Sequence, residues 1–172
     1  MLRIPNIING FIDDTDLKYS EFDKDEIKEL SLDEGDILII RSNGSLSIVG
    51  KSAIVSKRHR SFLFAGYLIR IRTNSDIYNS HLLNILLSSH NLRSQIESKA
   101  KSTSGVNNIN AKEIQALNIP LIPINQQTQI VEEIEKRFSE ADNLEKAINE
   151  SLEKSEALRQ SILKKAFEGQ LV

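Results

Sequence analysis

The sequence predicts an α+β fold in which a mixed-sheet domain is followed by one long helix. Two observations support this class. Residues 1–123 contain short apolar or alternating runs typical of strands, mixed with helical stripes but without a regular strand–helix–strand alternation. Residues 126–168 contain neither proline nor glycine and carry apolar residues at a seven-residue spacing. We therefore expect a first domain over 1–123 and a helix over 124–172.

Three stretches of the first domain have the character of strands. Residues 36–41 form an apolar run between turn signals, which predicts a buried strand. Residues 47–56 predict two short strands separated by a kink at Gly50. Residues 68–72 alternate apolar and basic side chains, as a half-exposed strand does.

Two helices are predicted after these strands. Asn79 or Ser80 can cap a helix that begins near His81. A second helical stretch covers residues 92–100. The residues that follow, 101–108, are polar and predict a flexible loop.

The long helix is predicted to start after two prolines. Residues 119–123 contain Pro120 and Pro123 and should be extended, because proline disfavours helix in the residue before it. Asn125 is a suitable N-cap, and Gly169 stands where the helix should stop. Roughly 40 residues of helix would be about 60 Å long.

An apolar stripe runs along this helix. Its length exceeds the roughly 30 Å width of so small a domain, so the stripe needs a second chain to cover it. The alternative is that the helix packs on its own domain. We expect an antiparallel coiled coil, either in a homodimer or with a related chain, whose interface contains Ile134, Phe138, Ala141, Leu144, Ile148, Leu152, Leu158 and Ile162.

Charge is distributed unevenly along the chain. The net charge is −2, but it is the sum of −8 over residues 13–36, +9 over 37–112 and −4 over 113–172, with Arg3 adding one positive charge. A basic middle between acidic segments suggests a site for a polyanion. The alternative is a solvated basic surface without a partner.

Three polar, basic segments in this middle region suit double-stranded DNA. Arg pairs with guanine and Asn with adenine in the major groove, whereas Lys, Ser and Thr hold phosphates. The segments are residues 41–45, 57–61 and 99–108. The candidate DNA contacts are Arg41, Ser42, Asn43, Ser45, Lys51, Lys57, Arg58, Arg60, Lys101, Thr103, Ser104 and Asn107.

Motifs for chemistry are weak, so we expect no enzyme activity. The absence of cysteine excludes zinc ribbons and thiol nucleophiles. Residues 44–52 resemble a phosphate-binding loop, but five residues instead of four separate the glycines, and a turn at Asn43-Gly44 explains them better. Asp14, Glu26 and Lys28 have the residue types of a nuclease metal site, but they lie in a helix-leaning stretch.

No membrane or export signal is expected. The longest apolar run covers residues 62–69, which is far short of the roughly 20 residues that span a bilayer. The first residues lack the apolar core of a signal peptide. We therefore expect a cytoplasmic protein.

Three stretches resemble the specificity subunits of type I restriction–modification systems. They are GDILIIRSNGS at 35–45, LNIPLIP and QQTQIV between 117 and 131, and ALRQSILKKAFEGQLV at 157–172. The similarity covers nearly the whole chain. The resemblance implies a target recognition domain over 1–123 and a spacer helix over 124–172.

The resemblance also implies the partners. Specificity subunits have no active site and read a bipartite DNA sequence. They hold modification subunits, which use S-adenosylmethionine to methylate adenine, and restriction subunits, which use ATP, dock on that core. We therefore expect DNA, modification subunits and restriction subunits as partners, and no cofactor in this chain.

A complete specificity subunit has two recognition domains and two spacer helices, whereas this chain has one of each. The resemblance therefore implies a half-subunit that pairs with itself or with another half-subunit. The family's recognition domain usually begins earlier, often with a tryptophan, which this sequence lacks. A truncated domain is thus expected, and the alternative function is a helix-mediated interaction or assembly module that no longer binds DNA.

Overall fold

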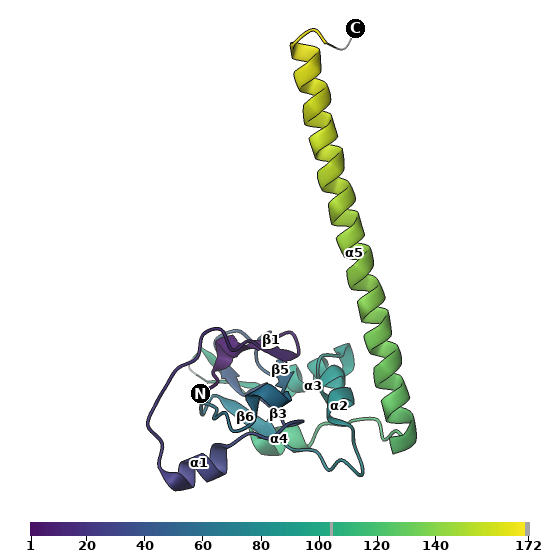
Figure 1. Cartoon of the computed structure of the whole chain (residues 1–172). Coiled ribbons are helices and arrows are strands. Elements are labelled where there is room, and N and C mark those ends of the chain that lie inside the picture. Colours follow the sequence, from purple (N-terminus) through teal and green to yellow (C-terminus); the bar gives the residue numbers. More distant parts are fainter. Residues whose placement is uncertain (104, 171–172) are drawn as a thin grey trace. The chain divides into compact units, whose positions relative to one another are not determined.

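The computed structural model describes residues 1–103 and 105–170 (Figure 1). The chain divides into two compact units, residues 1–128 and 129–172, and each is described by itself. The first unit combines small sheets with short helices, and the second is a single long helix. The predicted α+β class is confirmed.

The central sheet of the first unit has three antiparallel strands in the order β5 (Ser52–Ile54), β3 (Ile37–Ile40) and β6 (Leu68–Ile71). All four residues of β3 are buried, because it is the middle strand and its apolar run is covered on both faces. Ile39 faces Ser52 on one side and Ile69 on the other. The strands predicted over 36–41 and 68–72 are confirmed.

The chain from Gly44 to Gly50, which leads into β5, is a turn rather than the predicted strand. Ile48 and Val49 are not paired in a sheet; the N–H of Ile48 instead bonds the carbonyl of Ser45 at 3.2 Å. Gly50 has a φ of +80°, which glycine tolerates at no steric cost. Val49 is apolar because it packs inward from the turn, where it is fully buried. The prediction of a strand at 48–49 is therefore wrong.

Two helices follow the central sheet in sequence (Figure 1). Helix α2 (Ser80–Leu87) is capped by Asn79, whose side chain accepts hydrogen bonds from the second and third residues of the helix, as predicted. Helix α3 (His90–Lys99) is capped by Ser89 and starts two residues earlier than predicted. Both predicted helices are confirmed.

A second antiparallel sheet has the order β4 (Ser42–Asn43), β8 (Val106–Asn108) and β7 (Lys101–Thr103). The loop predicted over 101–108 is thus a hairpin. Gly105, with a φ of +79°, lies in its tip, and Ser104 is outside the described residues. The hairpin forms because β8 finds a partner strand, β4, that lies about sixty residues away in the sequence.

The beginning of the chain completes the core of the first unit. Leu2, Ile7 and Ile12 pack with residues of the central sheet and with Phe64. Parallel pairing among the described residues occurs only in isolated bridges, such as the one from Leu2 to Phe64. The remaining short elements are η1 (Ile4–Asn6), β1 (Ile7–Ile8), β2 (Phe11–Ile12), α1 (Lys24–Leu30), η2 (Lys57–His59) and α4 (Ala111–Gln115).

Helix α5 (Ile124–Phe167) has 44 residues. It begins one residue before Asn125, so this residue lies inside the helix and the N-cap prediction is wrong. Gly169 ends the helix as predicted, with a φ of +69°. The N–H of Gln170 bonds the carbonyl of Lys165 at 2.8 Å, the long-range bond of a Schellman motif.

The predicted apolar stripe of α5 is exposed in the single chain. Phe138, Leu144 and Leu158 each retain more than 60% of their accessible surface. A unit that consists of one helix has no second element to cover such a stripe. Pairing as an antiparallel coiled coil stays a prediction. No helix in the described part of the chain has the length and apolarity needed to cross a bilayer.

Candidate nucleic-acid interface

Two of the three predicted DNA-binding segments meet in one sheet. In the register of β4 and β8, Ser42 faces Asn108 and Asn43 faces Asn107. The side-chain amide of Asn107 donates a hydrogen bond to the carbonyl of Gly44 at 3.0 Å. Residues far apart in the sequence thus form one surface. We call β4, β7, β8 and the turn 44–51 the polar sheet.

The turn of the polar sheet presents short hydroxyl side chains. The N–H of Ser45 donates to the side-chain oxygen of Asn43 at 2.9 Å, which is the local bond expected of an Asx-turn. The hydroxyls of Ser45 and Ser47 lie 2.9 Å apart, and both residues are exposed. Ser42, by contrast, is 9% exposed and has little surface to offer a ligand.

Two predicted basic residues lie where the polar sheet joins the central sheet. Arg41 follows β3 directly; its N–H bonds the carbonyl of Tyr67, and its carbonyl accepts from Ile109. Lys51 is exposed, and its carbonyl accepts the N–H of Ile40 at 2.9 Å. These backbone bonds hold both cations at the same end of β3.

The hairpin carries the remaining candidates of this group. Lys101 and Thr103 belong to β7 and pair with Asn108 and Val106 of β8. The predicted contact Ser104 lies outside the described residues. Val106 is 44% exposed, so β8 presents an apolar side chain to solvent.

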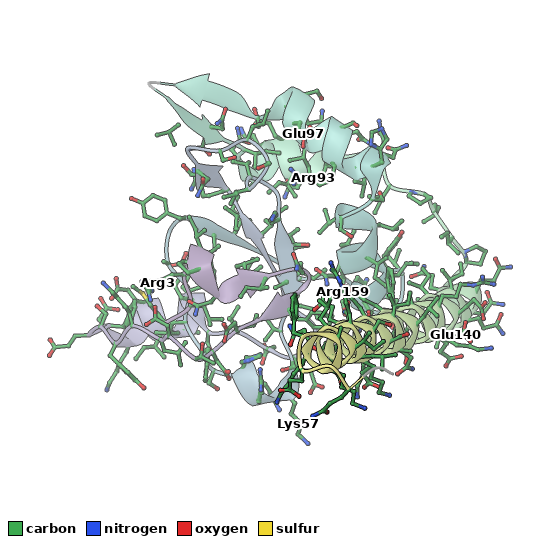
Figure 2. The ribbon with its side chains drawn as sticks, turned by 90° about the horizontal axis from the view of Figure 1, so that it is seen from above. Arg3, Lys57, Arg93, Glu97, Glu140 and Arg159 are labelled. Carbon is green, nitrogen blue, oxygen red and sulfur yellow. The ribbon has the colours of Figure 1, made fainter. Side chains whose placement is uncertain are left out.

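The third predicted segment lies elsewhere in the first unit. Figure 2 shows Lys57 near one edge of the unit, on the opposite side from Arg93 and Glu97 of α3. The Arg58 guanidinium is 3.5 Å from an oxygen of Asp14, and that of Arg60 is 3.8 Å from Asp33. The structure thus places Arg58 and Arg60 beside carboxylates of the acidic segment and does not bring this group to the polar sheet.

His59, within the segment 57–61, is a buried residue that makes contacts inside the fold. Only 2% of it is exposed, and its Nδ1 lies 3.0 Å from the hydroxyl of Ser56. Its Nε2 accepts a hydrogen bond from Arg58 at 3.0 Å and lies 3.3 Å from Asp14. Burial, and next the charge of Arg58, lower the pKa of His59, and they outweigh the opposing effect of Asp14.

Sequence reasoning missed Arg93, which lies in α3 and contacts the turn. Its Nη1 donates to the carbonyl of Val49 at 2.6 Å, and its Nη2 donates to that of Ser47 at 3.3 Å. Nη2 also bonds Glu97, one turn further along the helix, at 3.0 Å. No pattern in the sequence links Arg93 to a turn more than forty residues earlier, so only the tertiary structure reveals this contact.

The alternative sites have other geometries. The turn 44–51 leads into strand β5, whereas a phosphate-binding loop opens a helix. Glu26 accepts the N–H of Asp23 in the capping box of α1. Within residues 1–103 and 105–170, no group of three or more His, Asp or Glu side chains is arranged to hold a metal ion.

Comparison with known proteins gives the class of this chain. Residues 1–154 match the family model for the type I restriction modification DNA specificity domain. The chain belongs to this family, which confirms the resemblance noted in the sequence.

Individual relatives agree with this assignment. The chain is 36% identical over 172 residues to the specificity subunit of the type I restriction enzyme EcoKI of Escherichia coli (strain K12), covering 99% of this chain and 37% of that protein. It is 33% identical over 151 residues to the StySPI specificity subunit of Salmonella potsdam, covering 88% and 33%. A putative MjaX specificity subunit of Methanocaldococcus jannaschii is 32% identical over 166 residues, covering 96% and 38%. The chain therefore spans little more than a third of the length of these relatives.

Proposed function

We propose that this chain recognises a DNA sequence for a type I restriction–modification system and reads it with the polar sheet. The observation that carries the proposal is the meeting of residues 41–51 and 101–108 on one surface, in a chain of the DNA specificity domain family. The proposed contacts are Arg41, Asn43, Ser45, Lys51, Lys101, Thr103, Ser104 and Asn107.

The chemistry of the polar sheet suits duplex DNA. The amides of Asn43 and Asn107 have the donor and acceptor pattern that matches adenine in the major groove. Arg41 suits guanine, whereas Lys51 and Lys101 suit phosphates, which fix position without reading sequence. The net charge of +9 over residues 37–112 favours approach to a polyanion.

We further propose that two copies of the chain pair through α5 as antiparallel helices. The apolar residues of its stripe are placed symmetrically about Ile148. Leu144 and Leu152 lie four residues to either side of it, Phe138 and Leu158 ten, and Ile134 and Ile162 fourteen. A helix with this symmetry offers an antiparallel copy an apolar residue opposite each of these seven, whereas Ala141 would lie opposite Ser155. Such a dimer would read two identical half-sites in inverted orientation. A related half-subunit in place of the second copy would give an asymmetric site.

In this proposal, other chains carry out the catalytic steps of the restriction–modification system. Modification subunits would bind S-adenosylmethionine and methylate adenine, and restriction subunits would use ATP. This chain would position them on DNA and catalyse no step itself. The proposal predicts that the purified chain alone neither cleaves nor methylates DNA when Mg²⁺ and both cofactors are supplied.

A binding selection tests the DNA-reading function. The purified chain is incubated with random duplexes, and affinity for the enriched sequence is followed as salt is raised. We expect an enriched sequence and a linear loss of log affinity with log salt concentration. No binding at low salt would contradict the proposal and favour the alternative, an assembly module that acts through its helix.

Variants on the two edges of the first unit test which surface reads the DNA. The pair Arg41→Ala and Lys51→Ala should weaken binding, whereas the matched pair Lys57→Ala and Arg60→Ala, on the other edge, should change it little. A loss confined to the second pair would contradict the polar sheet as the reading surface.

Crosslinking tests the helix pairing. With cysteine introduced at Ile134 in one preparation and at Ile162 in another, an antiparallel pair should form the 134–162 disulfide readily and the 134–134 disulfide poorly. The opposite preference would indicate parallel helices.

A further inference from the structure

The turn of the polar sheet is fastened to helix α3 by one side chain. Arg93 donates from two nitrogens to two carbonyls of the turn, those of Val49 and Ser47, at 2.6 and 3.3 Å. Its side chain is only 17% exposed. A charged donor with two carbonyl acceptors is a strong and directional attachment.

The turn also lies unusually close to α3 at Gly50. A Cβ atom at this position would lie 2.5 Å from Cγ2 of Ile96 and 2.9 Å from Nη1 of Arg93. The backbone can approach this closely only because residue 50 has no side chain. Contact with the helix therefore defines the position of the turn as well as its shape.

Helix α3 supports the other half of the polar sheet too. The helix ends at Lys99, and strand β7 begins two residues later at Lys101. One helix is thus joined covalently to the hairpin and through Arg93 to the turn. The relative position of the two halves depends on the pairing of β4 with β8, on this shared support and on the bond between Asn107 and Gly44.

We propose that Arg93 is a positioning residue for DNA sequence recognition, which it controls by fixing the turn whose backbone bonds the base-reading amides of Asn43 and Asn107. The inference rests on the proposed DNA-reading function of the polar sheet. Contacts to base edges require donors and acceptors at fixed positions, whereas contacts to phosphates tolerate displacement. Loss of Arg93 should therefore reduce discrimination between sequences more than it reduces affinity for DNA in general.

The chain offers a matched pair of variants for the test. Arg93→Gln removes the guanidinium and with it both bonds to the turn. Glu97→Gln disturbs the ion pair with Arg93 but leaves the two carbonyl bonds in place. Arg93→Lys keeps the charge but can supply only a single ammonium group to two carbonyls, so it should fall between wild type and Arg93→Gln.

The measurement is the ratio of affinities for the selected duplex and a scrambled duplex, together with the salt dependence of each. For Arg93→Gln we expect this ratio to fall by about tenfold or more, the size of one lost base-pair preference. Affinity for the scrambled duplex and its salt dependence should match wild type, because the phosphate contacts remain. Glu97→Gln should keep the wild-type ratio.

Amide hydrogen exchange supplies a readout independent of DNA. The N–H groups of Gly50 and Lys51, which bond Ile40 and Ile48, should exchange faster in Arg93→Gln, while those of β3 should keep their protection. General loss of protection would make Arg93 a fold-stabilising residue and overturn the inference.

The binding outcomes separate this inference from the proposed function. An unchanged affinity ratio in Arg93→Gln overturns the positioning role while the DNA-reading function stands. An equal loss of affinity for both duplexes also overturns the positioning role, provided that the amides of β3 keep their wild-type protection from exchange. Arg93 would then be a phosphate contact. A wild-type chain without any sequence preference contradicts the proposed function itself, and the inference falls with it.

Discussion

Gln127 is a fully buried polar side chain whose hydrogen bonds are all satisfied by backbone groups. Its Oε1 accepts the N–H of Asn79 at 2.7 Å. Its amide nitrogen donates to the carbonyls of Ile77 and Ile122 at 3.0 and 2.7 Å. One side chain thus serves three backbone groups from two separate segments, next to the start of α2.

Substitution of Gln127 by leucine should therefore lower the free energy of unfolding of the first unit. Leucine fills a similar volume but leaves three backbone groups without partners, which costs about 2–4 kcal/mol. Urea unfolding followed by circular dichroism measures the loss. The control Gln126→Leu changes an exposed neighbour and should cost less than about 0.5 kcal/mol. Equal effects of the two substitutions would contradict the role of the buried amide.

His59 makes the stability of the first unit depend on pH. Burial, followed by the charge of Arg58, lowers the pKa of His59 in the folded chain below its ordinary value of 6.5. The unfolded chain therefore takes up a proton first as the pH falls. The stabilisation is complete above the unfolded pKa and is lost as the pH falls through the folded pKa.

Wild-type protein should accordingly lose stability as the pH falls below about 7, and His59→Gln should show a weaker dependence over the same range. Urea midpoints at several pH values check this difference. His90, an exposed residue at the start of α3, provides the control substitution His90→Gln, which should keep the wild-type profile. A wild-type urea midpoint that rises as the pH falls would contradict this prediction.

At the scale of elements, the close approach of the turn to α3 predicts a specific effect of Gly50→Ala. The added Cβ meets Ile96 at 2.5 Å, and the φ of +80° is unfavourable for alanine. The two effects together should cost about 2–4 kcal/mol of unfolding free energy. Gly105 has nearly the same φ but nothing within 4 Å of its Cβ position, so Gly105→Ala should cost only about 1 kcal/mol. Denaturant unfolding of both variants isolates the packing contribution, and equal losses would rule out close packing at Gly50.

The elements that could be predicted from the sequence are those with local signals. The apolar run of β3, the cap at Asn79 and the stop at Gly169 each carry their own physical cause within a few residues. The hairpin was missed because β8 is stabilised by β4, a partner remote in sequence. Ile48-Val49 was misassigned because an apolar pair signals burial, and burial can occur in a turn as well as in a strand.

In the candidate site too, local features could be predicted from the sequence, whereas tertiary contacts could not. Residue type alone led to the candidate segments 41–45 and 99–108, and their contact with DNA stays a prediction. Residue type also led to Arg58 and Arg60. The sequence could not show that Asp14 and Asp33 lie beside them, because these two carboxylates come from a distant segment. Arg93 could not be found in this way, because its contacts with the turn are tertiary.

At the scale of the whole molecule, the symmetry of α5 about Ile148 makes that residue the most sensitive point of the proposed pair. In an antiparallel dimer the two copies of Ile148 lie beside each other at the two-fold axis, so Ile148→Lys places two positive charges together in an apolar seam. Sedimentation equilibrium should then show a monomer where wild type shows a dimer. Gln160→Lys adds the same charge away from the stripe and should leave the dimer intact. A dimer that survives Ile148→Lys would place the seam elsewhere.

The same pair of variants also connects pairing to DNA binding. If both copies engage one duplex, the slope of log affinity against log salt concentration reflects the phosphates contacted by two polar sheets. Separation of the copies by Ile148→Lys should halve this slope and remove the gain in affinity that comes from binding two half-sites at once. Binding to a single half-site should persist, because no residue of the polar sheet is changed. A variant that is monomeric yet keeps the full slope would show that one copy makes all the contacts, and the reading of inverted half-sites by a dimer would have to be abandoned.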